Sequence, residues 1–287
     1  WKAIIGGKRI KVGAILEDVN GQLTAEVLSK EANEVTVKLN WEYGTFSELL
    51  LNSGTLPLPP YLHRESEESD KETYQTVFAK DDGSIAAPTA GLHFTDEILS
   101  KLNAKGIRIR ELTLHVGPGT FLPFSSDNVS QHKMHSEMFS INKLLLQDLK
   151  QDIEEKRKIV CVGTTSIRTL ESLYWAGNDI EDFQENSLVR QWSPYNSKKL
   201  ISPIESLDRL IDNTSGEVLQ GKTELIIVPS YEFKFTDGLF TNYHVPKSTL
   251  LLLVSAFVGD MWKDIYKSAL DNKYRFLSYG DSSLLWR

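Results

Sequence analysis

The chain has 287 residues, a formal net charge of −7, and 40% apolar and 25% charged side chains, the composition of an ordinary globular protein. Its longest apolar run, at 250–254, is far shorter than the roughly 20 residues that a membrane-spanning helix needs. The single cysteine, Cys161, excludes an internal disulfide framework and a metal site built from several thiolates. The acidic balance argues against bulk electrostatic capture of nucleic acid and leaves a local basic patch open.

The amino-terminal part of the chain has the pattern of a small all-β domain. Short β-rich runs alternate with turn signals, among them Asn20-Gly21, a dipeptide that tight hairpins favour. Strands at this spacing predict a small antiparallel barrel or sandwich. A stiff proline-rich stretch and an acidic run at 64–72 then mark the best domain boundary. We therefore predict a small β-barrel domain at 1–60, a linker at 61–73 and a second, α/β domain at 74–287.

In the second domain, continuous apolar strands alternate with amphipathic helices. This alternation predicts a largely parallel sheet covered by helices, an α/β/α sandwich-like domain. Residues 178–222 mix Ser, Asn, Pro and acidic side chains, and we predict that they form a surface insertion. The expected helices cover 46–52, 95–106 with Thr95 as N-cap, 143–155, 163–177 and 260–272, and a further helix begins at Ser248. The expected strands of the second domain cover 107–116, 159–162, 224–228, 231–235, 239–243 and 274–279.

Histidines gather in the second domain, near the ends of the expected elements. Loops at the carboxyl ends of strands are where α/β sheets bind ligands, and an imidazole titrates near neutral pH. The alternative is that each histidine only caps a turn or hydrogen-bonds to a backbone carbonyl. This structural explanation is favoured for any single histidine, but it is weaker for five histidines together. The five are His93, His115, His132, His135 and His244.

Two glycine-containing turns are candidate binding elements. The sequence Gly163-Thr164-Thr165-Ser166-Ile167-Arg168 lies between an expected strand and helix, where free N–H groups bind phosphate or carboxylate. The alternative is simple helix capping by Thr165 or Ser166. The motif Gly117-Pro118-Gly119 lacks the third glycine of a dinucleotide fingerprint but allows close approach of the backbone to a ligand. Lys247-Ser248-Thr249 lacks the upstream glycines of a phosphate-binding loop.

Several long motifs together closely resemble the S-adenosylmethionine:tRNA ribosyltransferase-isomerase family of queuosine biosynthesis. They lie at 74–79, 86–94, 114–121, 132–137, 162–172, 241–257 and 274–281. The resemblance implies a cytoplasmic, metal-free enzyme with an α/β domain and a small β-barrel. Such an enzyme transfers and isomerises the ribosyl group of S-adenosylmethionine onto a 7-aminomethyl-7-deazaguanine base at the tRNA wobble position, releasing adenine and methionine. Homo-oligomerisation is left open.

The implied reaction moves three protons, and histidine suits each step. A base removes the C5′ proton, an acid helps adenine to leave, and the attacking amine loses a proton. The candidate catalytic residues are His93, His115, His135 and Glu137, with His244 in reserve. We expect Arg168 and the 163–166 turn to hold the methionyl carboxylate, Glu137 or Asp281 to hold ribose hydroxyls, and Tyr279 and Phe94 to flank a base. The candidate substrate-binding residues are Gly91, Gly117, Gly119, Thr164, Thr165, Ser166, Arg168, His244, Lys247, Tyr279 and Asp281.

Recognition of the anticodon loop needs cations for phosphate and aromatic rings for stacking. Candidate phosphate contacts are Lys8, Arg9, Lys11, Arg108 and Arg110, of which the first three are equally explained as solvated strand positions. The sequence departs from the family in three places. It has no Asp-Thr-Arg segment before Trp1, which suggests a truncated chain. Its 178–222 segment is longer than usual, and Pro229-Ser230-Tyr231 replaces the usual Pro-Gly-Tyr.

Two other functions stay open. A non-catalytic RNA-binding paralogue would keep the fold without the chemistry. A metal-dependent hydrolase would use His132, His135 and Glu137, although a helical zinc site prefers histidines at i and i+4 rather than i and i+3. We predict no metal site.

Overall fold

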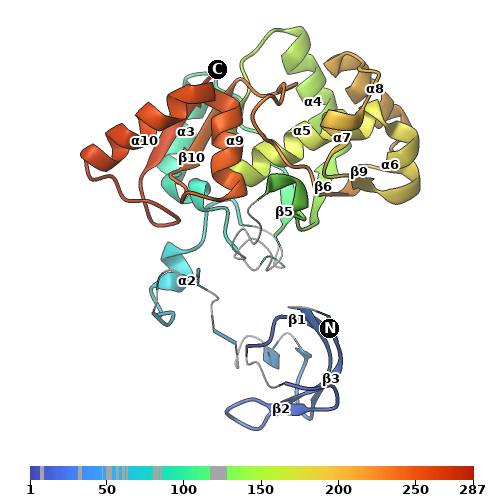
Figure 1. Cartoon of the computed structure of the whole chain (residues 1–287), viewed down its shortest axis with the longest axis vertical. Helices are drawn as coiled ribbons and strands as arrows, with labels where there is room; N and C mark the ends of the chain where they lie inside the picture. Colours follow the sequence, from blue (N-terminus) through green and yellow to red (C-terminus); the bar gives the residue numbers. More distant parts are fainter. Residues whose placement is uncertain are drawn as a thin grey trace. The chain divides into compact units, whose positions relative to one another are not determined.

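The computed structural model describes residues 1–6, 10–31, 34–46, 48–49, 54–55, 58–59, 62, 64–79, 84, 86–116 and 128–287 (Figure 1). The chain divides into two compact units. Unit 1 comprises Trp1–Leu58 and Leu62–Glu67, and unit 2 comprises Pro59–Tyr61 and Glu68–Arg287. No helix in the described part of the chain is long and apolar enough to cross a membrane.

Unit 1 is built on an antiparallel sheet with the strand order β1-β4-β3-β2. The expected hairpin at Asn20-Gly21 joins β2 and β3, and the Asp18 carboxylate accepts hydrogen bonds from the backbone N–H groups of Gln22 and Leu23 there. The described strands leave the sheet open, so a closed barrel is not confirmed. The strands are β1 (Lys2–Ala3), β2 (Ile15–Glu17), β3 (Leu23–Glu31) and β4 (Glu34–Trp41).

Unit 2 is mixed α/β and contains two further open sheets. One has the order β5-β6-β9-β8 and the other β11-β10-β7. Only the pairs β7–β10 and β8–β9 are parallel among the described strands, so the prediction of a largely parallel sheet is wrong. The strands are β5 (Thr113–His115), β6 (Glu137–Asn142), β7 (Val160–Val162), β8 (Leu188–Val189), β9 (Val218–Thr223), β10 (Gly238–Asn242) and β11 (Ser282–Trp286).

The helices expected from apolar periodicity and capping residues are confirmed. Thr95 and Ser248 cap α3 and α9, each accepting a hydrogen bond from the N–H three residues on. The helices are α2 (Asp70–Thr73), α3 (Asp96–Ala104), α4 (Lys143–Glu154), α5 (Thr164–Asn178), α6 (Ile180–Asn186), α7 (Ser193–Asn196), α8 (Pro203–Asn213), α9 (Thr249–Val258) and α10 (Trp262–Asp271), with 3₁₀ turns η2 (Thr89–His93), η4 (Val129–Gln131) and η5 (Gly259–Met261).

Helix α5 is the central element of unit 2 (Figure 1). Nearly all of its residues are buried, and it contacts strands of both sheets. Gly177 lies inside the helix rather than at its end, because a Cβ there would meet the backbone of Ser206 in α8 at 2.1 Å. The close approach of α8 therefore requires a glycine at this position.

The segment 178–222 is not a surface insertion. It contributes β8 and β9 to a sheet, and Phe183, Leu207 and Leu219 to the main apolar core. Its polar composition misled the prediction because β9 alternates exposed and buried residues, so half of its side chains face solvent.

Three expected strands also differ from the structure. Residues 224–228 and 231–235 form no strand, and β10 pairs with β11 and β7 instead of forming a local hairpin. The closing strand lies at Ser282–Trp286 rather than at 274–279. The helix expected at 46–52 lies largely outside the described residues.

Candidate functional site

Four segments that are distant in the sequence meet at the carboxyl ends of β7 and β10. Because these strands are parallel, both end at the same edge of their sheet. The chain leaves β7 through Gly163 and enters α5, while Gly280 and Asp281 precede β11. The turn η2 contacts β10, and a Cβ built on Gly163 would lie 3.8 Å from that of Ala90. This edge is the candidate site.

His93 is held at this edge by Asn242, the last residue of β10. The Asn242 Nδ2 lies 3.2 Å from His93 Nε2 and 3.4 Å from the Gly280 carbonyl oxygen. Thr89 Oγ1 donates to Asn242 Oδ1 at 3.3 Å. The His93 ring also packs edge-on against Phe240, with centroids 5.7 Å apart. Thus the predicted catalytic residue His93 is partly buried and is contacted by two residues of β10.

The amino terminus of α5 carries no side-chain cap. Gly163 occupies the capping position with φ of 94°, and no side chain caps the first N–H groups. The alternative that Thr165 or Ser166 simply caps the helix is therefore wrong. Thr164 is buried, while Thr165 and Ser166 are partly exposed. Uncapped N–H groups, two hydroxyls and the helix dipole together suit a carboxylate or phosphate.

Arg168, one turn further along α5, forms an ion pair with Glu137 at the start of β6. Their side chains are only 10% and 7% exposed. The structure thus brings two predicted site residues together, and Glu137 neutralises the charge of the Arg168 guanidinium. Nε of Arg168 is buried and has no hydrogen-bond partner within the described residues, so one donor is left over.

His115 and His135 do not join Glu137. His115 lies opposite Met138 in the β5–β6 register, which places its side chain on the other face of the sheet from Glu137. His135 is exposed and close to His132, whose pKa is lowered by burial and then by the charge of His135. No hydrogen bond among the described residues joins His115 or His135 to Glu137 or to His93.

His244 is buried in the protein interior. Its Nε2 lies 3.0 Å from Thr241 Oγ1, and its backbone N–H donates to the Tyr266 hydroxyl. Burial lowers the pKa of His244 to about 4, so the ring is neutral near pH 7. This burial is typical of a structural histidine, and the expected place of His244 among the substrate contacts stays a prediction.

The remaining candidates occupy varied positions. The Tyr279 hydroxyl donates to the buried Asp70 at 2.9 Å, and Asp281 accepts a hydrogen bond from the backbone of Arg275. This bond, the largest cause, and the nearby Arg275 guanidinium hold the pKa of Asp281 below its usual value. Lys247 is exposed just before α9.

Gly91 has a packing role. A Cβ at this position would meet the Thr76 methyl group at 3.1 Å and the Phe78 ring at 3.2 Å. The glycine thus lets η2 pack closely on the segment before it. Gly117, Gly119, Lys8 and Arg9 lie outside the described residues.

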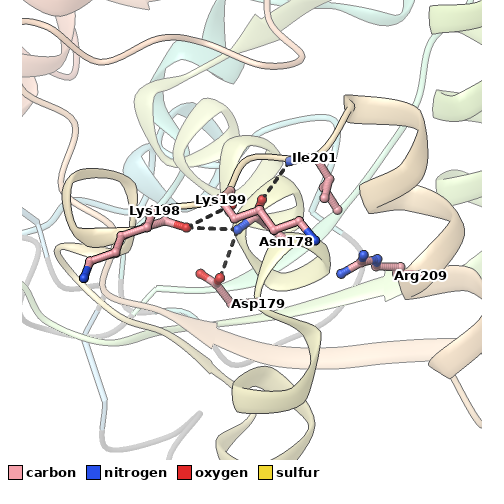
Figure 2. A pocket seen from close by; sticks show the side chains of 7 residues that line it. Asn178, Asp179, Lys198, Lys199, Ile201 and Arg209 are labelled. Atoms are coloured by element: carbon pink, nitrogen blue, oxygen red, sulfur yellow. Dashed lines mark hydrogen bonds between the residues drawn. The ribbon is translucent and has the colours of Figure 1, made fainter.

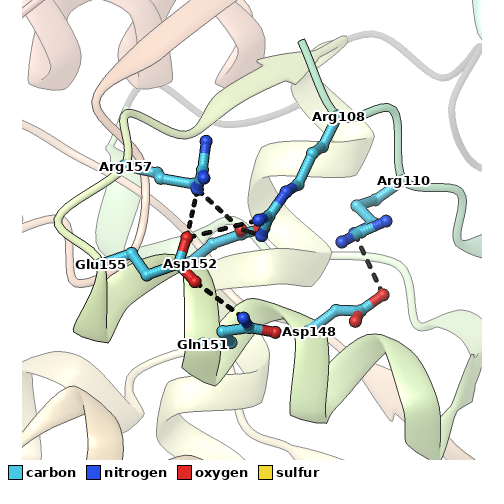
Figure 3. A network of polar contacts seen from close by, with 7 residues as sticks. All are labelled: Arg108, Arg110, Asp148, Gln151, Asp152, Glu155 and Arg157. Carbon is cyan, nitrogen blue, oxygen red and sulfur yellow. Dashed lines mark hydrogen bonds and ion pairs between the residues drawn. The ribbon is translucent and has the colours of Figure 1, made fainter. Parts of the chain in front are cut away.

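Arg108 and Arg110, expected to contact phosphate, are engaged by acidic side chains of α4 (Figure 3). Arg108 donates to Asp152 at 2.6 Å, and Arg110 lies 3.1 Å from Asp148. Since carboxylates already neutralise both guanidinium groups, the structure disfavours them as phosphate contacts.

A pocket of about 340 Å³ lies at the other end of α5 (Figure 2). At 1.5 Å per residue, its Asn178 is about 20 Å from Thr164. Cations and a carboxylate share the lining, and Arg209 is already paired with Glu205. None of the candidate residues lines this pocket, so it is separate from the candidate site.

Metal binding finds no support in the described ranges. No group of three or more His, Cys, Asp or Glu side chains there is placed to hold an ion. His132, His135 and Glu137 therefore do not form the cluster that the metal-dependent hydrolase would need.

Sequence reasoning missed Asn242. It is only 3% exposed and connects η2, β10 and the segment before β11. The signal available in the sequence was its place at the end of an apolar strand, two residues before His244.

Comparison with known proteins places the chain in a family. The family model described as queuosine biosynthesis protein matches residues 1–285. The S-adenosylmethionine:tRNA ribosyltransferase-isomerase of Halothermothrix orenii is 40% identical over 289 residues, covering 99% of this chain and 73% of that protein. The crystal structure of the S-adenosylmethionine tRNA ribosyltransferase of Thermotoga maritima is 27% identical, with a TM-score of 0.45, and the match covers 97% of this chain and 67% of that one. On the family match and the curated relative, this chain belongs to the queuosine biosynthesis protein family.

Proposed function

We propose that the protein transfers and isomerises the ribosyl moiety of S-adenosylmethionine onto 7-aminomethyl-7-deazaguanine at the tRNA wobble position. The products are epoxyqueuosine-tRNA, adenine and methionine. The family match and the 40% identical ribosyltransferase-isomerase support this reaction. In the structure, the supporting observation is the meeting of His93, Asp281 and the uncapped α5 terminus at one sheet edge.

The two ends of S-adenosylmethionine fit different parts of this edge. The methionyl carboxylate suits the N–H groups of Thr164, Thr165 and Ser166 and the hydroxyls of the last two. Arg168 is paired with Glu137, so in this proposal it supports the start of α5 and the carboxylate is held by the helix terminus. Asp281 stays ionised near neutral pH and suits a ribose hydroxyl. His93 acts electrostatically on Asp281, and this supports a role for His93 at the sugar, where bonds to adenine and sulfur are broken.

The proposal also includes roles for His115 and His135. Both lie near the start of β6, His135 is exposed, and neither contacts the His93 edge in any described hydrogen bond. We assign them to the tRNA side of the reaction, together with the exposed Lys247. We further propose that the reaction needs no metal, that it occurs in the cytoplasm, and that the unit 1 sheet corresponds to the small barrel domain.

The test is release of adenine from S-adenosylmethionine by the purified protein. Adenine should appear only when tRNA carrying the deazaguanine precursor is present. A protein that releases none with this tRNA contradicts the proposal. The other candidate, a non-catalytic RNA-binding paralogue, is favoured by Ser230 in place of the usual glycine; it predicts tRNA retention on a filter without turnover.

A further inference from the structure

Asn242 presents an N–H group to His93, and its own orientation is fixed by its neighbours. The Gly280 carbonyl can only accept a hydrogen bond, so it must face the Nδ2 end of the amide. Thr89 Oγ1 lies at the other end, against Oδ1. The same Nδ2 is 3.2 Å from His93 Nε2. Because an amide nitrogen only donates, Nε2 must be the accepting nitrogen of a neutral imidazole.

We infer that Asn242 is a positioning residue that keeps His93 as the Nδ1–H tautomer. In this tautomer the ring offers a hydrogen-bond donor at Nδ1, which has no partner among the described residues. This inference rests on the proposed function. It means that neutral His93 stabilises negative charge by donating a hydrogen bond from Nδ1–H, and that it is not the base that removes the C5′ proton.

The surroundings of His93 are consistent with this assignment. Among the described residues, the titratable group that interacts electrostatically with His93 is Asp281. The Asp281 carboxylate is already bonded to the backbone N–H and paired with the guanidinium of Arg275. Phe240 packs against the ring from β10. Asn242 is 3% exposed, so water does not compete easily for its amide. An N–H group at Nε2 would face the Nδ2–H donor, so this contact disfavours the Nε2–H tautomer.

The tautomer can be read directly by long-range ¹H–¹⁵N NMR on the full chain labelled with ¹⁵N-histidine. The His93 signal is assigned by its loss in His93→Gln. The expected result at pH 7 is the Nδ1–H pattern. Asn242→Asp keeps the shape of the side chain but supplies an acceptor, so it should put a proton on Nε2, in the Nε2–H tautomer or the imidazolium. A wild-type Nε2–H pattern, or a pattern unchanged in Asn242→Asp, overturns the inference.

Kinetics separates positioning from a purely structural role. Asn242→Asp should lower kcat for adenine release at least tenfold with little change in the KM for tRNA, because the neutral Nδ1–H tautomer is lost while the binding surface is kept. Thr89→Val, which removes only the bond to Oδ1, should give a smaller loss. The matched control is Asn272→Ala, whose amide bonds only to Ser268 at the end of α10. Equal losses in Asn242→Asp and in this control would contradict the inference.

Failure of the inference can be told apart from failure of the proposed function. If the wild-type chain releases no adenine, the proposed reaction fails, while the NMR result still decides whether Asn242 sets the His93 tautomer. If adenine is released and the tautomer does not respond to Asn242→Asp, the inference alone fails.

Discussion

The carboxylate of Glu137 and the guanidinium of Arg168 form an ion pair that is almost fully withdrawn from solvent. It joins the first residue of β6 to the second turn of α5, and therefore one sheet of unit 2 to the helix that both sheets share. Two charges buried in this way stabilise a fold only while both are present, since each alone is an uncompensated charge in a medium of low polarity.

Removing one partner of this pair should therefore be costly. We expect Arg168→Met to lower the free energy of unfolding by about 3 to 5 kcal/mol, measured by urea denaturation. The double variant Glu137→Gln/Arg168→Met should recover much of the loss, because no buried charge remains. Additive losses in the double variant would mean that the two side chains contribute independently.

His244 should make stability depend on pH. Its pKa is about 4 in the folded protein because of burial, against about 6.5 when unfolded. The unfolded chain therefore binds the proton more readily than the folded chain. The contribution of His244 to the free energy of unfolding is fully present above pH 6.5 and is lost as the pH falls toward 4. The full effect is about 3 kcal/mol. In His244→Asn the slope of unfolding free energy between pH 6.5 and 4 should flatten, and an unchanged slope would contradict the assignment.

The predictions from sequence succeed where the signal is local. Helices α3 and α9 were placed by Thr95, Ser248 and an apolar stripe, all of which lie within a few residues of one another. Strand partners are not encoded in this way. The segment 274–279 is as apolar as a strand, yet β10 takes 282–286 as its neighbour, since pairing depends on which backbone the fold brings alongside.

The same distinction applies to the site. Turn residues beside helices and strands singled out His93 and the α5 terminus, and the structure brings these two to one sheet edge. The sequence did not single out Asn242, because its position in the site depends on hydrogen bonds to Thr89 and His93, about 150 residues away in the sequence. His244 looked equivalent to His93 in its motif and differs only in burial, which no local pattern reports.

Glu171 should be among the least replaceable residues of unit 2. It is fully buried and accepts five hydrogen bonds, among them those from the Tyr231 hydroxyl and the backbone of Lys234. Burial raises the pKa of its carboxyl, and the donors oppose that rise. In Glu171→Gln an NH₂ group must face N–H or O–H donors, and we expect a loss of about 3 kcal/mol in urea denaturation.

A nearby carboxylate supplies the control for this prediction. Glu232 is exposed and bonds only to Lys234 in the described structure, so Glu232→Gln should change stability by less than about 0.5 kcal/mol. A loss in Glu171→Gln as small as in Glu232→Gln would show that the five donors find other acceptors.

Ser230 occupies a turn position that favours glycine. The N–H of Tyr231 bonds to the carbonyl of Val228, with Pro229 first and Ser230 second in the turn, and Ser230 has φ of 86°. A positive φ at this position defines a type II turn, where a side chain costs about 1 kcal/mol or more. Ser230→Gly should therefore raise the thermal midpoint by about 2 to 4 °C for a chain of this size. Ser230→Ala removes the hydroxyl but keeps the strained Cβ, so it should give no increase; an equal rise in both variants would assign the effect to the hydroxyl and not to the backbone.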